Sequence, residues 1–358
     1  MKVTYNPEYK RRLKTAFIGC GGHAYRNIYP TFQYAPVQLV AVCDLDAQKA
    51  ADCARIFGAK RSYTDHREML AKEKPEVVFI VTSYGPGAKP LYPALAMDCM
   101  KAGAHAWIEK PPAGSSKEIA TMMRISQETG KQVGVGFKKM FFTAHQKAHT
   151  LINRPEFGRI TSITASYPEW LPPLRERENP EKMVLFLDHF VHPHSLLRLL
   201  GGPLDWIFVN RCETNGAASV SLRFKSGAVG NLLFSAGQSE CSYRERIEVI
   251  GEGENVVIEN GLRVIHYPKV NRQEEYGRSG DYYELFKDAP RCWEPEFSLG
   301  ELHNKGLFLL GYAPEVIHFT TRLLKGQAPL WGNLDDALEL LKIYEAYLQA
   351  DATIVPVG

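Results

Sequence analysis

The N-terminal part of the chain contains the stretch Phe17-Ile18-Gly19-Cys20-Gly21-Gly22-His23-Ala24, which follows an apolar run and leads into a segment that can be helical. This is the strand, turn and helix context of a dinucleotide-binding fingerprint. Gly19 permits a tight turn, Gly21 lets the backbone approach a pyrophosphate, and Ala24 falls where helix and strand pack closely. The unpaired N–H groups at the start of the helix suit phosphate oxygens. Taken alone, the glycines fit a turn without a ligand equally well.

Asp44 decides between these interpretations. It ends a second apolar run, residues 37–43, at about the spacing from the glycines where an acid meets the adenosine ribose. A carboxylate there accepts hydrogen bonds from both ribose hydroxyls and repels a 2′-phosphate. Leu45 and Asp46 follow, so no neighbouring arginine is available to hold that phosphate. The sequence therefore predicts NAD rather than NADP as the cofactor, and Asp46 is better placed than Asp44 to cap the next helix.

Two kinds of pattern divide the chain. From residue 14 to residue 137, apolar runs alternate with helix-like stretches, which is typical of a doubly wound parallel sheet. After Phe141 come a helix, several alternating strands separated by turn signals, and two closing helices, which indicates an antiparallel sheet. We therefore expect an α/β protein with an NAD-binding Rossmann domain over residues 1–140 and a substrate-binding and oligomerisation domain over residues 141–358.

Composition argues against several other classes of protein. The 358 residues are 45% hydrophobic and 23% charged, which suits a globular protein with two cores, and no apolar stretch approaches a membrane span. A net charge of +3, spread along the chain, argues against nucleic-acid binding. The first residues lack the apolar region of a secretory signal. Seven cysteines without a C-x-x-C pair predict reduced thiols in a cytoplasm, with no disulfide and no metal site.

Two further motifs carry chemistry: Glu109-Lys110-Pro111 and Asp188-x-x-x-His192. Together with the glycine turn, and in this order, they resemble the glucose-fructose oxidoreductase, inositol dehydrogenase and rhizopine-catabolism (Gfo/Idh/MocA) family of NAD(P)-dependent sugar and polyol oxidoreductases. Similar short sequence motifs at residues 135–141, 157–160 and 326–329 extend the resemblance over nearly the whole chain. It implies a Rossmann domain, then an α/β domain with a large open antiparallel sheet, and a homodimer or homotetramer assembled through that sheet.

The resemblance also implies a reaction centre. Lys110 is placed beside the nicotinamide and the reacting oxygen, where an ammonium stabilises developing negative charge; alone, it fits a surface lysine paired with a glutamate. His192 is implied as general base, with Asp188 as its partner and a substrate ligand. They share one face if the backbone is helical, although Pro193 is expected to open or bend a helix there. The predicted cofactor-binding residues are Gly19, Gly21, Gly22, His23, Ala24, Asp44, Thr82, Ser83, Tyr84, Glu109, Lys110 and Pro111.

Substrate contacts are expected from segments that reach the cleft, and the candidates are Lys139, Trp170 and His189. A cationic and aromatic lining suits a sugar, a uronate or another anionic carbohydrate, although an isolated tryptophan is more often a packing residue. Arg175 and Arg177 fit an exposed, charge-balanced loop better than a substrate site. His194 is predicted to be structural.

The chain departs from the family pattern in two places. Residues 82–92 form a longer loop rich in glycine and proline, with Tyr92 near the place of a family histidine. The loop follows a strand of the nucleotide domain, so it either shapes the substrate entrance or is an insertion that solvent tolerates. Phe190 stands where the family usually has glycine.

The motifs predict reversible oxidation of a secondary hydroxyl of a sugar, a sugar derivative or a cyclic polyol by hydride transfer. One alternative is an NAD-dependent redox-assisted glycoside hydrolase, in which transient oxidation acidifies a neighbouring C–H and NAD is recycled. A second alternative is a non-catalytic dinucleotide-binding sensor. The presence of Lys110, Asp188 and His192 argues against the sensor, whereas both enzymes need the same residues because both begin with hydroxyl oxidation.

Overall fold

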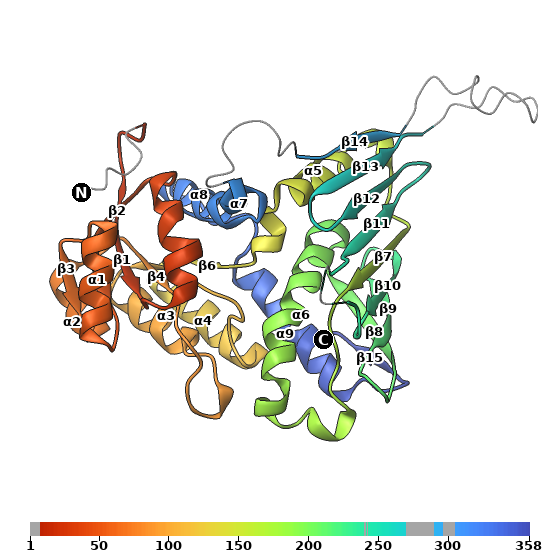
Figure 1. Ribbon diagram of the computed structural model, residues 1–358, viewed down its shortest axis with the longest axis horizontal. Coiled ribbons are helices and arrows are strands. Elements are labelled where there is room, and N and C mark those ends of the chain that lie inside the picture. The colour runs from red at the N-terminus through yellow and green to blue at the C-terminus, as the bar shows by residue number, and fades with distance from the viewer. Residues whose placement is uncertain (1–7, 240, 242, 270–289, 296–304) are drawn as a thin grey trace, which may run out of the picture.

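Two sheets organise the protein in the computed structural model, which describes residues 8–239, 241, 243–269, 290–295 and 305–358 (Figure 1). A six-stranded parallel sheet with helices on both sides is built from the N-terminal third. A nine-stranded sheet follows, with helices packed between the two sheets. The expected α/β class, a Rossmann domain followed by a domain with a large open sheet, is confirmed.

The first sheet has the strand order β3-β2-β1-β4-β5-β6. Its strands are β1 (Leu13–Ile18), β2 (Val37–Cys43), β3 (Arg61–Tyr63), β4 (Val77–Ile80), β5 (His105–Ile108) and β6 (Val133–Val135), and its helices are α1 (Ala47–Phe57), α2 (His66–Glu73), α3 (Tyr92–Lys101) and α4 (Ser116–Thr129). The central strands are buried except at Lys14 and His105 near their amino ends, as their near-continuous apolar runs require. The edge strand β3 lacks such a run, and the sequence did not reveal it.

The segment after the glycine turn is helical but irregular. A π-helical turn, η1 (Ala24–Ile28), is followed directly by a 3₁₀ turn, η2 (Tyr29–Gln33). Phe17 of β1 stacks on Tyr29 with ring centroids 3.9 Å apart, and Phe32 contacts the same ring. These aromatic contacts fix the segment against the sheet next to the predicted nucleotide site.

The second sheet has the order β14-β13-β12-β11-β7-β10-β9-β8-β15. Its strands are β7 (Ser162–Tyr167), β8 (Leu204–Arg211), β9 (Ala218–Phe224), β10 (Val229–Phe234), β11 (Arg246–Ile250), β12 (Asn255–Glu259), β13 (Arg263–Tyr267), β14 (Arg291–Trp293) and β15 (Ile354–Pro356). Neighbours pair antiparallel except β7 and β10, which run parallel with Val229 opposite Ser162. The sheet is therefore mostly antiparallel, as expected, with one parallel pair where β7, from a distant segment, inserts between β10 and β11.

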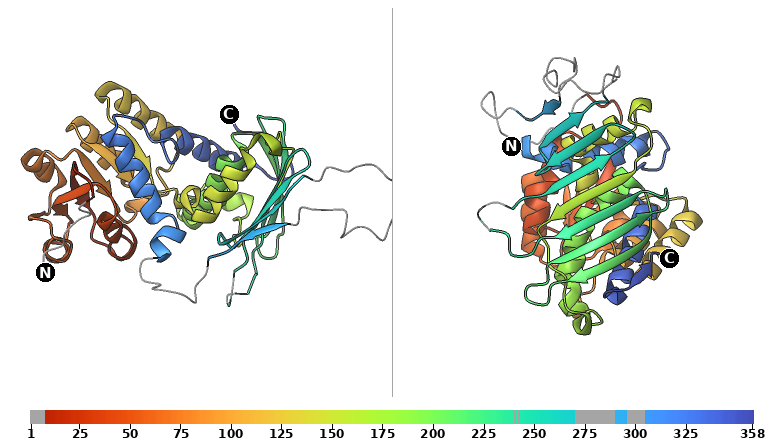
Figure 2. Two further views of the ribbon diagram at one scale, coloured as in Figure 1. Left: turned by 90° about the horizontal axis from the view of Figure 1, so that it is seen from above. Right: turned by 90° about the vertical axis from the view of Figure 1, so that its right-hand side faces the viewer.

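Helices cover one face of this sheet, and Figure 2 shows the other face turned toward the viewer with the helices behind it. The helices of this half are α5 (Thr143–Ile152), α6 (Pro180–Gly201), α7 (Lys305–Leu309), α8 (Tyr312–Leu324) and α9 (Leu334–Gln349), and the short 3₁₀ turns of the chain outside η2 are η3 (Pro86–Ala88), η4 (Lys138–Phe141), η5 (Pro155–Phe157) and η6 (Leu174–Glu176). None of the helices in the described ranges combines the length and apolar character needed to cross a membrane.

The C-terminal helices return to the first sheet. Phe319 of α8 lies edge-on to Phe79 of β4, with ring centroids 6.4 Å apart, and α8 shares one apolar core with β1 and η2. Gly134 of β6 leaves room for Phe319, since a Cβ there would come 2.8 Å from the Phe319 ring. Residues assigned to the second domain thus help to bury the first sheet, and the division at residues 140 and 141 remains a prediction.

Candidate active site

The glycine turn after β1 has the shape that a dinucleotide needs. Gly19 has a φ of +105°, and a Cβ built on it would lie 1.8 Å from the carbonyl oxygen of Val81, so only glycine fits. A Cβ built on Gly21 would meet none of the described atoms within 4 Å, so this residue faces open space on the side where a pyrophosphate approaches. Arg26 donates from Nε to the carbonyl oxygen of Gly22 at 3.2 Å, which holds a guanidinium beside the turn.

Asp44 is held rigidly at the end of β2. Its Oδ2 accepts a hydrogen bond from the N–H of Cys20 at 2.7 Å, and its Oδ1 accepts one from the N–H of Asp46 at 2.9 Å. Asp46 caps α1 by accepting from two N–H groups of the first turn, as predicted. Leu45 between them is 94% exposed and offers an apolar surface where an adenine ring would lie beside the ribose acid. These residues fit NAD.

Glu109 joins the glycine turn to the second motif. Its buried carboxylate lies at the end of β5, with Oε1 2.8 Å from His23 Nε2 and Oε2 accepting from the N–H of Lys110 at 2.9 Å. The peptide bond between Lys110 and Pro111 is cis. The alternative of a surface lysine paired with its neighbouring glutamate is wrong, because the Lys110 ammonium points away from Glu109 to another carboxylate.

That carboxylate is Asp188 of α6. Lys110 Nζ lies 2.8 Å from Asp188 Oδ2, and the Tyr84 hydroxyl donates to Asp188 Oδ1 at 2.8 Å. Burial and the neighbouring Asp188 raise the pKa of the Tyr84 hydroxyl well above its usual range, so Tyr84 remains a proton donor in the hydrogen bond. The three side chains come from the loop after β4, the segment after β5 and helix α6, so the fold brings together residues up to 104 positions apart.

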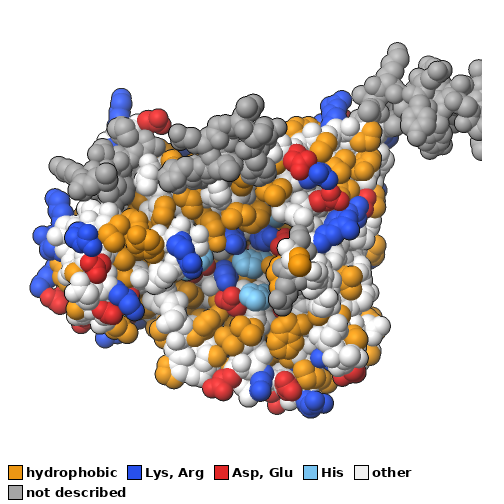
Figure 3. All heavy atoms as spheres, viewed as in Figure 1, with side chains coloured by type: hydrophobic (Ala, Val, Ile, Leu, Met, Phe, Trp, Pro, Cys, Tyr) orange, Lys and Arg blue, Asp and Glu red, His pale blue; other side chains and the backbone are white. Residues whose placement is uncertain are grey.

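A cavity of about 250 Å³ surrounds this group. It is lined by His23, Val81, Thr82, Ser83, Tyr84, Tyr92, Glu109, Lys110 and Asp188. The Oγ1 atom of Thr82 is buried there without a hydrogen-bond partner among the described residues, which is a position that a bound ligand would satisfy. Lysines, histidines and acidic residues gather in the hollow between the two halves of the molecule (Figure 3). The long loop therefore lines the site through Tyr84 and Tyr92 rather than standing apart in solvent.

His192 lies on the same helix but in a neighbouring, smaller cavity, beside Lys139, Tyr167 and Glu245. Helix α6 continues through Pro193, so the proline does not open a helix at this point. No hydrogen bond joins Asp188 to His192 within the described part of the chain, because Asp188 is engaged by Lys110 and Tyr84. Burial lowers the pKa of His192 well below its usual value, and the nearby ammonium groups of three lysines lower it further. His192 is therefore neutral.

Comparison with known proteins agrees with this architecture. The family model described as "Oxidoreductase family, NAD-binding Rossmann fold" matches residues 13–137, and that of the "GFO/IDH/MocA C-terminal domain" matches residues 145–257. The chain belongs to the Gfo/Idh/MocA family of oxidoreductases. Residues 13–137 thus form an NAD-binding Rossmann fold.

Individual relatives are distant. The chain is 31% identical over 140 residues to 4-carboxy-2-hydroxymuconate-6-semialdehyde dehydrogenase of Sphingobium sp., a match that spans 39% of this chain and 43% of that protein. It is 24% identical over 307 residues to myo-inositol 2-dehydrogenase of Thermotoga maritima, spanning 77% of this chain and 87% of that protein. An Agrobacterium radiobacter oxidoreductase crystallised with NAD+, L-tartaric acid and magnesium superposes with a TM-score of 0.75 at 17% identity, covering 97% of this chain and 99% of that one, which shows the shared fold.

The three predicted substrate residues of this Gfo/Idh/MocA protein have different surroundings. Lys139 is buried in an ion pair with Glu245, and its ammonium lies 4.7 Å from the centre of the Phe142 ring. Trp170 is 38% exposed. His189 is half exposed and lies next to Asp188, so it is the candidate that contacts the central group of the site.

The expectation of a solvated loop is wrong for Arg177. Its guanidinium is buried and donates to the carbonyl oxygens of Pro172, Tyr347 and Ala350 at 2.7–2.9 Å. Two of these carbonyls belong to the C-terminal end of α9, where helix carbonyls lack intrahelical donors. Arg175 is exposed, as expected.

His194 is structural, as predicted. It is 1% exposed, its Nδ1 bonds to the carbonyl oxygen of Phe190, and its Nε2 lies 3.1 Å from the Tyr347 hydroxyl. The Phe190 side chain is itself buried beside this imidazole.

Helix α8 adds a polar group that the sequence did not reveal. Lys138 Nζ donates to the Tyr312 hydroxyl at 2.8 Å, and the Tyr312 ring meets His23 edge-on. Glu315 is buried nearby with neither carboxylate oxygen hydrogen-bonded within the described residues, and burial raises its pKa well above the usual value. No local signal marks these residues, because α8 reaches the site only through the packing of distant segments.

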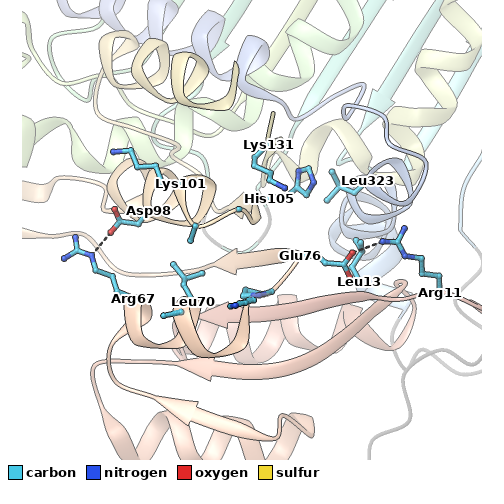
Figure 4. A pocket seen from close by; sticks show the side chains of 15 residues that line it. Arg11, Leu13, Arg67, Leu70, Glu76, Asp98, Lys101, His105, Lys131 and Leu323 are labelled. Carbon is cyan, nitrogen blue, oxygen red and sulfur yellow. Dashed lines mark hydrogen bonds and ion pairs between the residues drawn. The ribbon is translucent and has the colours of Figure 1, made fainter. Parts of the chain in front are cut away.

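A larger hollow of about 750 Å³ lies at the opposite edge of the first sheet (Figure 4). Its walls come from the amino ends of β1 and β5 and from the C-terminal ends of α2 and α3, with Arg11 paired to Glu76 and Arg67 to Asp98. Ligands of open α/β sheets bind at the carboxyl ends of the strands, so this hollow is not the active site.

Proposed function

We propose that the protein is an NAD-dependent dehydrogenase that oxidises a secondary hydroxyl of a sugar, a sugar derivative or a cyclic polyol. The proposal rests mainly on the Lys110–Asp188 pair, which lies in a cavity beside the glycine turn. The substrate class is supported by the similarity to myo-inositol 2-dehydrogenase over most of both chains.

In this proposal, the glycine turn and Arg26 hold the pyrophosphate, and Asp44 accepts hydrogen bonds from the adenosine ribose. Glu109 positions His23 and Lys110 through its two carboxylate oxygens. The bound nicotinamide supplies a hydride acceptor. Lys110 then stabilises the substrate oxygen as it gains negative charge. Asp188 orients the substrate by accepting a hydrogen bond from a hydroxyl group, and substrate competes with Tyr84 for it.

His192 is proposed as the base that receives the hydroxyl proton. Being neutral, it has a free ring nitrogen for that proton, and the three nearby lysines disfavour its charged form, so the proton must leave again quickly. Lys139 and Trp170 are proposed to contact the more distant part of the substrate. Two further proposals are a homodimer or homotetramer assembled through the open face of the second sheet, to be checked by light scattering, and a cytoplasmic location, to be checked by fractionation.

The test is a screen of free sugars, inositols, uronates and aryl glycosides that follows NADH absorbance and aglycone release in parallel. We expect net NADH from a free sugar or polyol, without glycoside cleavage. Sustained aglycone release with substoichiometric NAD and no NADH would replace the dehydrogenase by the redox-assisted hydrolase. Tight NAD binding with no turnover of any substrate would favour the sensor.

A further inference from the structure

Helix α6 carries a second imidazole at the site, and its surroundings are opposite to those of His192. The His189 side chain is 49% exposed and has a carboxylate on each side. The charged and titratable groups that face it are Glu169 from the segment after β7, Asp188 and His192 on α6, and Lys110 after β5.

Glu169 has the geometry of an orienting group. Its side chain is 1% exposed, and Oε2 lies 3.2 Å from His189 Nδ1. The other oxygen, Oε1, accepts a hydrogen bond from the N–H of Trp170 at 2.9 Å, which fixes the carboxylate. Oε2 is buried and forms no hydrogen bond within the described residues, and the His189 ring lies beside it at ion-pair distance. Because an unpaired buried carboxylate is costly, His189 is its natural partner, with Nδ1 carrying a proton.

The other ring nitrogen faces the reaction centre. His189 Nε2 lies 3.7 Å from Asp188 Oδ2, and the same oxygen is 2.8 Å from Lys110 Nζ. Glu169, His189, Asp188 and Lys110 thus lie one beside the next, from a buried carboxylate to the ammonium proposed to meet the reacting oxygen, although the 3.7 Å between His189 Nε2 and Asp188 Oδ2 is longer than a hydrogen bond. Of these four side chains, the half-exposed ring of His189 is the one proposed to exchange protons with solvent.

The surroundings shift the pKa values of the two imidazoles in opposite directions. Burial and three lysines lower the pKa of His192, whereas the contact with Glu169 raises the pKa of His189 despite the opposing effect of burial. A proton released inside the site is therefore more stable on His189 than on His192. Paired groups whose surroundings separate their pKa values in this way are typical of divided acid–base roles.

We propose that His189, oriented by Glu169, is the proton exit of the active site. The inference rests on the proposed dehydrogenase function. In each oxidation the C–H bond gives its electron pair and hydrogen to the nicotinamide, the O–H bond breaks, and one proton has to reach water. That proton is first taken by His192 and then leaves the site through His189 Nε2 to a solvent base, while the Nδ1 proton stays with Glu169. Reduction of the ketone takes up a proton by the reverse route.

The first test needs no substrate. NMR titration of the full-length protein with NAD bound should give His189 a pKa above the usual 6.5 or so, and Glu169→Gln should lower it by about one unit or more. His66 is the matched control, because it pairs with Asp98 at 3.0 Å away from the site, and its NMR signals should be the same in both proteins. A His189 pKa at or below the usual value, or one that Glu169→Gln leaves unchanged, would overturn the proposal.

The second test is kinetic. His189→Gln should reduce kcat at least tenfold in dilute buffer with little change in KM, and added imidazole should restore much of the loss, because a solvated base replaces the missing relay. Glu169→Gln should give a smaller loss, and His66→Gln should match the wild type. A loss of kcat that imidazole does not restore, a change in KM alone, or an unchanged kcat would each contradict a proton exit at His189.

These results separate the two proposals. If the wild type forms no NADH from any sugar or polyol, the dehydrogenase proposal fails, and the titration still decides whether Glu169 and His189 form a coupled pair. If NADH forms normally in His189→Gln, the dehydrogenase stands and the proton exit is refuted.

Discussion

Alanine substitutions at Gly19 and Gly21 should separate the structural and the ligand-binding roles of the glycine turn. At Gly19 a Cβ would lie 1.8 Å from the Val81 carbonyl oxygen, at a φ of +105° that side chains rarely adopt. To reach an ordinary contact, β1 and β4 would have to separate by roughly 1.5 Å. That movement strains the hydrogen bonds from the Gly19 N–H to Cys43 and from the Val81 N–H to Ile18.

The expected loss of folding stability in Gly19→Ala follows from the backbone strain and the two weakened hydrogen bonds. Backbone strain contributes about 1–2 kcal/mol and each of the two weakened hydrogen bonds about 1 kcal/mol, so we expect a loss of about 3–4 kcal/mol. For a protein of this size, that lowers the melting temperature by roughly 5 °C. Gly21→Ala should leave stability within about 1 kcal/mol of the wild type, because its Cβ meets no described atom within 4 Å.

Affinity for NAD should respond differently from stability. The Cβ of Gly21→Ala occupies the space where the pyrophosphate approaches the backbone, so we expect binding to weaken at least tenfold, or about 1.4 kcal/mol. Differential scanning calorimetry and fluorescence titration with NAD measure the two effects on the same samples. Normal NAD affinity in Gly21→Ala, or equal melting of Gly19→Ala and the wild type, would refute this account of the turn.

Three further outcomes are expected. The wild type should bind NAD more tightly than NADP, and Asp44→Ala should remove most of the difference in a fluorescence titration; equal binding by the wild type would contradict the role of Asp44. Lys110→Ala should lower kcat about a hundredfold or more while NAD binding largely survives, and nearly normal turnover would remove Lys110 from the reaction centre. Burial lowers the pKa of His194 to about 4, so the unfolded chain binds a proton that the folded protein does not bind between about pH 6.5 and pH 4. Stability should therefore fall as pH falls through that window, by up to about 3 kcal/mol from this residue, and His194→Gln should reduce the slope of unfolding free energy against pH; an unchanged slope would contradict the assignment.

Local patterns predicted much of the Rossmann half. Helix α4 (Ser116–Thr129) follows from local signals, because Ser115 caps it and apolar residues repeat on one side. The sequence also predicted that Asp46 rather than Asp44 caps α1, since capping depends on residues only a few positions apart. Edge strand β3 was missed, because two of its three residues are exposed and the burial signal is absent.

Long-range features did not follow from local patterns. The charge-balanced segment around Arg177 predicted solvation, but the distant end of α9 supplies carbonyl oxygens that bury the guanidinium. The parallel pairing of β7 with β10 depends on the path of a segment more than 50 residues long, and no periodicity within either strand specifies a partner.

The sequence by itself determined the nucleotide-binding fold of the N-terminal domain. Its signals are a glycine turn, an acid at the end of the next strand and buried apolar runs, and each of them acts over short distances along the chain. It also indicated Lys110 and Asp188 as chemical residues through their motifs. Only the tertiary structure decided that Asp188 pairs with Lys110 and Tyr84 and not with His192, and that Glu169 lies behind His189. These contacts join different elements, with 20 positions between Glu169 and His189 and 104 between Tyr84 and Asp188. They depend on where the sheets and α6 come together, which the packing of the whole chain determines.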